Sequence, residues 1–392
     1  MACWIVALEG GPEGANHASV AIGHCIYAFG SCVCSDDSST GESDESDESD
    51  EYNESFGVHV LNTTDYRWSR VITRIFESQE SVDESERSFQ PYGEIPTFRE
   101  GHTVVAYDGM VYMWGGYCVE TRTLCSKMYC FDPENKTWSV IPSRSETPPG
   151  RVRHTAVVYK NMMLIHGGQN DIQTTISDDV WAYNFDTRKW CEVIINGESP
   201  PGREHHTACI IKEKMYIFGG TNGTDGEIGM DILNLETGSW ETPEITGEIP
   251  YTVREPCSWV HHDKMYVFGG WRQRDSRHTS DLYRFDPERS IWHRMHPFGL
   301  RGPIGRQRHC GVIVEDRVFV FSGIISLIPY ELNTDIGYIL ELCDLYVLNF
   351  NWTLKDLASL VVLHEVSETD FGIIPFDLDF HLRMMVTSND TL

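Results

Sequence analysis

The sequence predicts an all-β fold: a six-bladed β-propeller that is closed by its own N-terminal strand and followed by a short helical tail. Two observations predict it. A sequence repeat recurs about every 50 residues, and the chain holds 33 glycines, 17 tyrosines and 11 tryptophans in 392 residues. Glycine supplies tight turns and aromatic residues favour pleated surfaces, so this composition is typical of many short strands.

Paired glycines after an apolar run mark each repeat. The intact pairs lie 52, 52 and 50 residues apart, at Gly115-Gly116, Gly167-Gly168, Gly219-Gly220 and Gly269-Gly270. A tryptophan follows the first glycine of each pair by 21 to 23 residues, at Trp138, Trp190, Trp240 and Trp292. This pattern resembles the kelch repeat, in which each repeat forms one four-stranded blade. We expect the glycines to turn the backbone where a side chain would collide with the next blade.

The two ends of the chain predict how the ring closes. Six pairs of first and second strands begin near His17, His102, His154, His206, Ser258 and His309. The last repeat has a third strand at 344–348 but no fourth, whereas Trp4–Leu8 at the N-terminus is a strand without a partner. We expect this strand to complete the sixth blade, because the pairing removes the exposed sheet edges. The predicted propeller spans residues 1–350.

Two polar segments interrupt the repeats. Residues 36–54 contain ten Asp and Glu side chains and no Lys or Arg, which predicts a mobile loop between the second and third strands of the first blade. Residues 73–97 are also polar and predict a long loop between the first and second blades.

Charge and composition exclude several function classes. A net charge of −28 repels phosphate backbones and anionic lipid surfaces, so neither nucleic acid nor a membrane is an expected partner. No apolar run is long enough to cross a membrane and the first residues lack the features of a signal peptide, which predicts a cytoplasmic or nuclear protein with reduced cysteines. No catalytic, cofactor or metal motif stands out, so a binding module is favoured over an enzyme.

Repeated arginines predict a binding surface on one rim of the propeller. They precede the first strands in five repeats, at Arg99, Arg151, Arg203, Arg254 and Arg306. Antiparallel pairing places them on the same face as the loops after the paired glycines, where Arg272 lies. A basic pocket in an acidic protein attracts carboxylates. The repeated histidines beside these arginines are expected to bond the neighbouring blade's backbone rather than a metal.

After Asn351 the apolar period changes from two to three or four residues, which predicts an amphipathic helix in the tail, residues 351–392. The helix carries Leu354, Leu357, Ala358 and Val362 in a pattern similar to the elongin-binding box of cullin-2 receptors. Further along, Ile374, Pro375, Asp377 and Leu378 resemble the cullin-2 box, in which proline starts a helix.

With its kelch ring, its start Trp4 to Pro12 and these two boxes, the chain resembles the kelch-repeat substrate receptors of cullin-2 ubiquitin ligases over essentially its whole length. The resemblance implies a non-catalytic adaptor that binds C-terminal degrons ending in glycine and directs their ubiquitination and degradation. Its implied partners are elongin B, elongin C, cullin-2 and a RING-box protein. By the same resemblance the degron carboxylate is held by Arg254 and Ser258, with Arg203, Arg306 and Arg272 nearby. The alternative is a kelch scaffold associated with actin or with meiotic chromatin.

Overall fold

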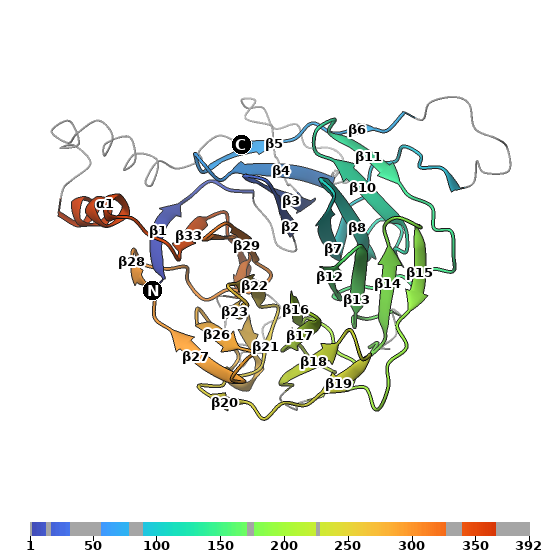
Figure 1. Ribbon diagram of the computed structural model, residues 1–392. Helices are drawn as coiled ribbons and strands as arrows, with labels where there is room; N and C mark the ends of the chain where they lie inside the picture. The colour runs from blue at the N-terminus through green and yellow to red at the C-terminus, as the bar shows by residue number, and fades with distance from the viewer. Residues whose placement is uncertain are drawn as a thin grey trace, which may run out of the picture.

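The computed structural model describes residues 2–12, 17–31, 56–77, 89–170, 176–224, 228–326 and 339–365. Six sheets, each with a core of four antiparallel strands, are arranged around a central axis, as Figure 1 shows. The inner strand of each sheet contacts the inner strands of both neighbouring sheets, and the sixth contacts the first. The predicted six-bladed ring is therefore confirmed.

Each blade repeats the same four-strand order. The inner strands are β2 (Ala18–Ile22), β7 (Arg99–Tyr107), β12 (Thr155–Tyr159), β16 (Thr207–Ile211), β22 (Cys257–His261) and β29 (Cys310–Val314). The second strands are β3 (Cys25–Ser31), β8 (Met110–Cys118), β13 (Met162–His166), β17 (Lys214–Phe218), β23 (Lys264–Phe268) and β30 (Arg317–Phe321). The third strands are β4 (Phe56–Asn62), β10 (Met128–Asp132), β14 (Val180–Asn184), β18 (Met230–Asn234), β26 (Leu282–Asp286) and β33 (Leu345–Asn349). The outer strands are β5 (Arg67–Arg70), β11 (Thr137–Val140), β15 (Lys189–Glu192), β19 (Ser239–Glu241), β27 (Ile291–Met295) and β1 (Cys3–Leu8).

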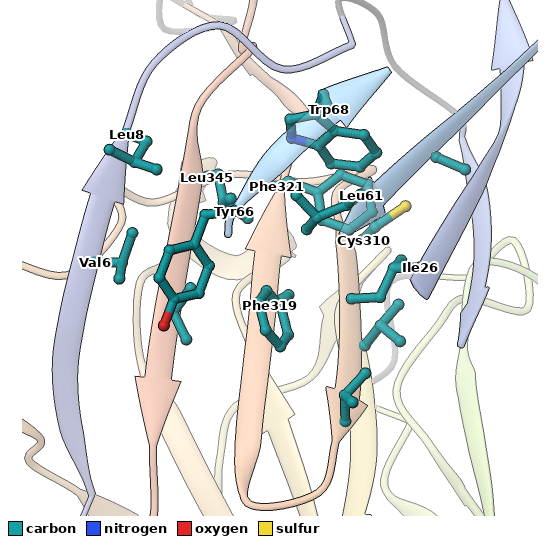
Figure 2. Close-up of a cluster of buried hydrophobic side chains, with 14 of the residues drawn as sticks. Val6, Leu8, Ile26, Leu61, Tyr66, Trp68, Cys310, Phe319, Phe321 and Leu345 are labelled. Carbon is teal, nitrogen blue, oxygen red and sulfur yellow. The ribbon is translucent and has the colours of Figure 1, made fainter. Parts of the chain in front are cut away.

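The N-terminal strand completes the sixth blade. β1 pairs antiparallel with β33, so the first residues of the chain and the last strand of the ring share one sheet. Val6 and Leu8 of β1 pack with Leu345 and Phe319 in an apolar cluster that continues to Trp68 of the first blade (Figure 2). Burying these side chains joins both ends of the chain to one core, and burial of apolar area is the main force that stabilises such a core.

The paired glycines lie where one blade contacts the next. Gly167 has a φ of +66°, and a Cβ placed on it would collide with the carbonyl oxygen of Arg203 in the next blade. Gly220 has a φ of +88°, and its Cβ would lie 2.5 Å from the carbonyl oxygen of Glu204, in the loop before the inner strand of its own blade. The backbone angle and the contact exclude a side chain at both glycines, but only at the first glycine would that side chain collide with the next blade, as the repeat predicts.

Part of the predicted polar loop 73–97 is ordered as a strand, which the sequence did not predict. β6 (Arg74–Ile75) pairs in parallel with β11 and widens the second blade. Two equivalent additions occur elsewhere: β20 (Thr246–Gly247) pairs with β27, and β28 (Phe298–Gly299) pairs with β1. Two residues of backbone pairing need no apolar pattern, so composition alone gives no signal for these strands. The acidic segment 36–54 lies outside the described residues.

Several loops between the blade strands contain short strands of two or three residues. They are β9 (Thr123–Leu124), β21 (Val253–Arg254), β24 (Trp271–Arg272), β25 (Arg277–His278), β31 (Ile324–Ser326) and β32 (Ile339–Glu341), with one 3-10 turn, η2 (Gln273–Asp275). β21, β24 and β25 form a small sheet of their own at the start of the fifth blade.

The tail begins with α1 (Leu354–Glu365), and the predicted helix is therefore confirmed. The helix start is capped reciprocally: the amide of Asp356 donates to Thr353 Oγ1, and the amide of Thr353 donates to the Asp356 carboxylate. Among the helices in the described part of the chain, none has the length and apolar character needed to cross a membrane.

Candidate functional site

Four of the five repeated arginines are buried, and three of these four pair with an aspartate. The fourth, Arg99, is 2% exposed and donates to Thr97. Arg151, Arg203 and Arg306 expose at most 1% of their surface. Arg151 donates to both carboxylate oxygens of Asp179, at 2.5 and 3.0 Å, and Arg306 donates to both oxygens of Asp344. Arg203 donates to one carboxylate oxygen of Asp231 and to the carbonyl of Gly229. In each case the aspartate directly precedes or begins the third strand of the arginine's own blade. The ion pair therefore fixes the loop before the inner strand to the loop before the third strand.

This burial corrects the expectation that Arg203 and Arg306 bind a ligand. Burial lowers the pKa of Arg203, and the Asp231 carboxylate opposes that effect. Both guanidinium groups are buried and already paired with a carboxylate, so neither presents an exposed charge to a ligand. The sequence could not distinguish these arginines from surface ones, because their aspartate partners lie 28 and 38 residues away along the chain.

Arg254 does not belong to this buried set, although its local sequence looks the same. The second glycine of each pair donates its N–H to the carbonyl of the buried arginine of the next blade, as Gly168 does to Arg203. In the fifth blade the acceptor of this bond is Val253. Glu255 also takes the left-handed conformation that His205 takes two residues after Arg203. The structural repeat is therefore shifted by one residue, and Val253 occupies the place of the buried arginine.

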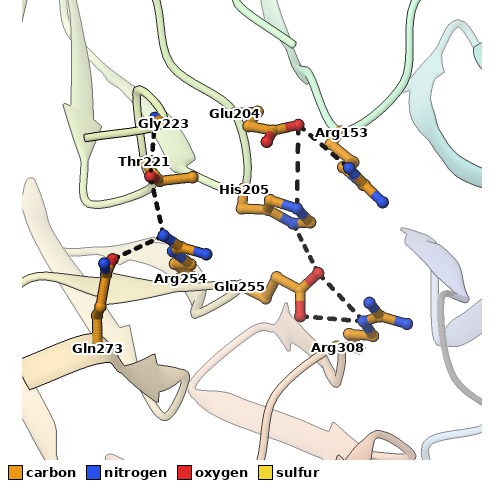
Figure 3. A network of polar contacts seen from close by, with 9 residues as sticks. All are labelled: Arg153, Glu204, His205, Thr221, Gly223, Arg254, Glu255, Gln273 and Arg308. Atoms are coloured by element: carbon orange, nitrogen blue, oxygen red, sulfur yellow. Dashed lines mark hydrogen bonds and ion pairs between the residues drawn. The ribbon is translucent and has the colours of Figure 1, made fainter. Parts of the chain in front are cut away.

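The shift places the Arg254 side chain in a different environment. It is half-buried, and its Nη2 donates to Thr221 Oγ1 at 3.1 Å and to Gln273 Oε1 at 2.7 Å, as Figure 3 shows. Both partners are neutral, and within the described residues Arg254 forms no ion pair. Its positive charge is thus left without a carboxylate. We call Arg254, Thr221, Gln273 and the strand β24 beside them the blade-five rim site.

Other cations and aromatic rings border the blade-five rim site. Arg272, on β24, is held by Asp275 through hydrogen bonds of 2.7 and 2.6 Å and lies over the ring of Tyr251 at 5.4 Å. Arg274 lies over the same ring at 5.5 Å. Strand pairing puts Trp271 beside Arg254, and its indole packs edge-on against His278 with ring centroids 4.8 Å apart. The predicted residue Arg272 therefore does lie next to Arg254, but its charge is already compensated.

Ser258 and Arg254 have different hydrogen-bond partners. The Ser258 hydroxyl contacts the hydroxyl of Thr207 and lies 3.1 Å from Cys209 Sγ, both on β16 of the preceding blade. The serine thus links two inner strands, whereas Arg254 bonds to loop residues. A shared carboxylate would require Ser258 to exchange at least one of these partners.

A chain of alternating charges crosses the face where the inner strands begin. Arg153 pairs with Glu204 at 3.4 Å, His205 Nδ1 lies 2.6 Å from Glu255, and Arg308 Nε donates to both Glu255 oxygens at 3.1 Å (Figure 3). We call these five residues the mouth network. All of them except Glu204 line a cavity of about 210 Å³ together with the repeated histidines. Burial alone would raise the pKa of Glu255, but hydrogen bonds and charge from His205 and Arg308 lower it to about 2.

The repeated histidines are structural, and the prediction holds for some of them. His102 and His309 contact the backbone of the preceding blade, at Phe29 and Phe268, as predicted. The imidazoles of His154 and His206 bond instead to the hydroxyls of Thr103 and Thr155 in the preceding blades, at 2.8 and 2.9 Å. Burial lowers the pKa of His102 and of His309 to about 3. These rings are therefore neutral spacers between blades.

The first turns of the tail helix, residues 354–359, show an inverted pattern of exposure. Asp356 and Ser359 are buried, whereas Leu354 is 83% exposed and Ala358 is also exposed. Leu357 is half-buried. The Val362 side chain and the residues Ile374, Pro375, Asp377 and Leu378 lie outside the described part of the chain, so their predicted roles stay predictions.

Comparison with known proteins gives the same fold and extends it to a family. Residues 101–323 match the family model described as the KLHDC2/KLHL20/DRC7 Kelch-repeats domain. Kelch domain-containing protein 3 of human, mouse and rat is 30% identical over 99% of this chain and 97% of its own length. The chain belongs to this kelch family. Shorter similarities include the acyl-CoA-binding domain-containing protein 4 of Arabidopsis thaliana, 29% identical over 42% of the chain. Kelch-repeat proteins are generally scaffolds for protein interactions rather than enzymes, and this chain is one of them.

Proposed function

We propose that this kelch protein is a substrate receptor of a cullin-2 ubiquitin ligase, which binds proteins by a C-terminal glycine at the blade-five rim site and binds elongin B and elongin C through α1. The inverted exposure of α1 carries the proposal. An amphipathic helix on a folded domain normally buries its apolar face. Here the polar residues Asp356 and Ser359 pack inward, and Leu354 is left 83% exposed for a partner.

Arg254 supports the substrate half of the proposal. A guanidinium that bonds only neutral side chains keeps its charge available for an anion, and a terminal carboxylate fits the planar fork of arginine. A chain that ends in glycine can bring its carboxylate close to the Trp271 ring and the β21 backbone, because it has no side chain. The lack of room for a side chain would then select glycine as the terminal residue, and the positive charge of Arg254 would select the carboxylate.

The ligase half is tested by a pull-down of purified elongin B–elongin C with the full chain. Leu354→Asp should reduce binding below detection, because a charge would enter an apolar helix groove. The matched control is Ile194→Asp, since Ile194 is 86% exposed on the propeller and lies far from α1 in sequence. Equal binding by both variants would exclude α1 as the elongin site and would leave an interaction scaffold without this attachment.

The substrate half is tested with peptides that end in glycine. We expect Arg254→Ala and C-terminal amidation each to weaken binding by about one to two decades, because a charge-assisted bond contributes about 1.5–3 kcal/mol. The two changes should not add, since both remove the same ion pair. Arg70→Ala, at an exposed arginine on the outer strand β5, is the control for lost charge. Equal affinity for acid and amide peptides would exclude carboxylate recognition.

A further inference from the structure

The face opposite the mouth network carries a separate cluster of metal-ligating side chains. His261 ends the inner strand β22, His262 lies in the turn that follows, and Asp316 lies in the equivalent turn between β29 and β30 of the next blade. One ligand atom from each of the three lies within 4.8 Å of the others. Among the described residues, this is the one group of three His, Cys, Asp or Glu side chains that meets so closely.

Two of the three side chains are held in place by their neighbours. The His261 ring stacks on Phe350 with centroids 4.3 Å apart, and its Nε2 lies 2.8 Å from Asp316 Oδ1. Asn351 Nδ2 donates to the other carboxylate oxygen of Asp316 at 3.2 Å, and the amide of Phe350 donates to its carbonyl. Metal ligands are typically oriented by such outer hydrogen bonds. The imidazole nitrogen and the carboxylate oxygen are therefore already held next to each other, 2.8 Å apart, before any ion arrives.

His262 supplies the movable third group. It is exposed, and its ring centroid lies 4.0 Å from that of His261. Its backbone φ is +48°, and the next residue, Asp263, has a φ of +55°, as expected for the two central residues of a tight hairpin turn. The turn fixes the backbone, while the exposed imidazole can rotate toward an ion without displacing a packed neighbour.

We propose that His261, His262 and Asp316 bind one divalent transition-metal ion of the zinc type. Imidazole nitrogen and carboxylate oxygen suit zinc, cobalt and nickel, whereas magnesium and calcium prefer sets made of oxygen. Ligand atoms of tetrahedral zinc lie about 3.4 Å apart, so His261 and Asp316 need to separate slightly and His262 needs to move closer. Binding replaces the proton that His261 and Asp316 share, and the exposed side of His262 leaves one coordination position for water.

The site would connect the fifth blade, the sixth blade and the segment that leads into α1. His261 belongs to the fifth blade and Asp316 to the sixth, and both contact Phe350 or Asn351, which lead into α1. A bound ion would thus stabilise the exit of the tail from the ring. The inference does not depend on the proposed substrate or on elongin.

The test uses the full chain freed of any histidine tag, with Zn²⁺ measured in competition with a chromophoric chelator and Co²⁺ measured by visible absorption. We expect one equivalent of metal, bound at least tenfold more weakly by His262→Ala and by Asp316→Asn. His24→Ala is the matched control, because His24 is an exposed histidine at the hairpin between β2 and β3 of the first blade. It should leave the affinity unchanged.

His262→Ala is the decisive variant, because its exposed side chain can be removed without disturbing the fold, whereas Asp316→Asn also changes the bond to His261. The proposal is overturned if the parent binds no equivalent of metal, or if His262→Ala binds as tightly as His24→Ala. A cobalt spectrum dominated by thiolate charge transfer would assign the ion to the cysteines instead. An increase in Tm with Zn²⁺ that His262→Ala abolishes would support the proposal independently of the optical signal.

Discussion

Arg203 and Arg254 have almost the same sequence context and opposite surroundings. Each is followed by glutamate and stands at the start of an inner strand of the propeller. Arg203 is 1% exposed and paired with Asp231, whereas Arg254 is half-buried and bonds two neutral side chains. A shift of one residue, with Val253 in the buried place, separates them. The comparison teaches that the partner of a charge, rather than its motif, decides whether an arginine holds the fold together or remains available to a ligand.

The largest difference should appear in stability. Arg203→Ala should lower the free energy of unfolding by about 3–5 kcal/mol, because it leaves the Asp231 carboxylate without its buried partner. Arg254→Ala should change it by less than about 0.5 kcal/mol, as is usual for a side chain whose loss strands no buried charge. Chemical denaturation of both variants measures the contrast. Equal losses would mean that Arg254 is also a structural residue, and the blade-five rim site would lose its main support.

A smaller effect is expected from Glu255, which follows Arg254 in sequence and whose carboxylate lies between His205 and Arg308. Its pKa is lowered to about 2 in the folded chain, from an ordinary value of 4.5. A lowered folded-state pKa stabilises the fold above the ordinary value, and this stabilisation is lost as pH falls from about 4.5 toward 2. The loss should be on the order of 3 kcal/mol.

The measurement compares the unfolding free energies of the parent and Glu255→Gln at pH 7 and near pH 3. The parent should be the more stable of the two at pH 7, and the gap should shrink at the lower pH, since the substituted amide cannot titrate. A gap that stays constant with pH would show that the mouth network stabilises the chain by geometry rather than by charge.

The fold could be predicted from sequence to a greater depth than the site. The glycine pairs and the tryptophans mark positions that every blade needs, and they recur about every 50 residues. The strand Trp4–Leu8, which has no partner nearby in the sequence, indicates how the ring closes. Whether an arginine is paired with a carboxylate depends instead on residues far along the chain: Asp231 lies 28 residues from Arg203, and Gln273 lies 19 residues from Arg254. No local pattern specifies these partners. The sequence does mark the fifth blade as different, because Cys257 stands where the motif of the other arginine repeats has a histidine and the spacing from Arg203 to Arg254 is 51 residues instead of 52. These signals do not show which residue takes the buried place.

The smallest expected effect concerns the ten acids between residues 36 and 54. It should depend on Arg254 and not on the buried, paired arginines. The segment connects β3 to β4, whose ends Ser31 and Phe56 pair with each other on the face where the inner strands begin. Its charges attract cations that lack a partner, such as Arg254, but cannot reach arginines that are buried and paired. Replacing the ten acids by their amides should tighten binding of a peptide that ends in glycine by about threefold at low salt, and the gain should shrink near 0.15 M salt, where the screening length falls to about 8 Å. The same replacement should leave the free energy of unfolding unchanged, because Arg151, Arg203 and Arg306 keep their aspartates. Peptide titrations at two salt concentrations, with Arg254→Ala as the background in which the gain must disappear, measure the effect. A gain that persists in that background would assign the repulsion to the peptide alone and not to competition for Arg254.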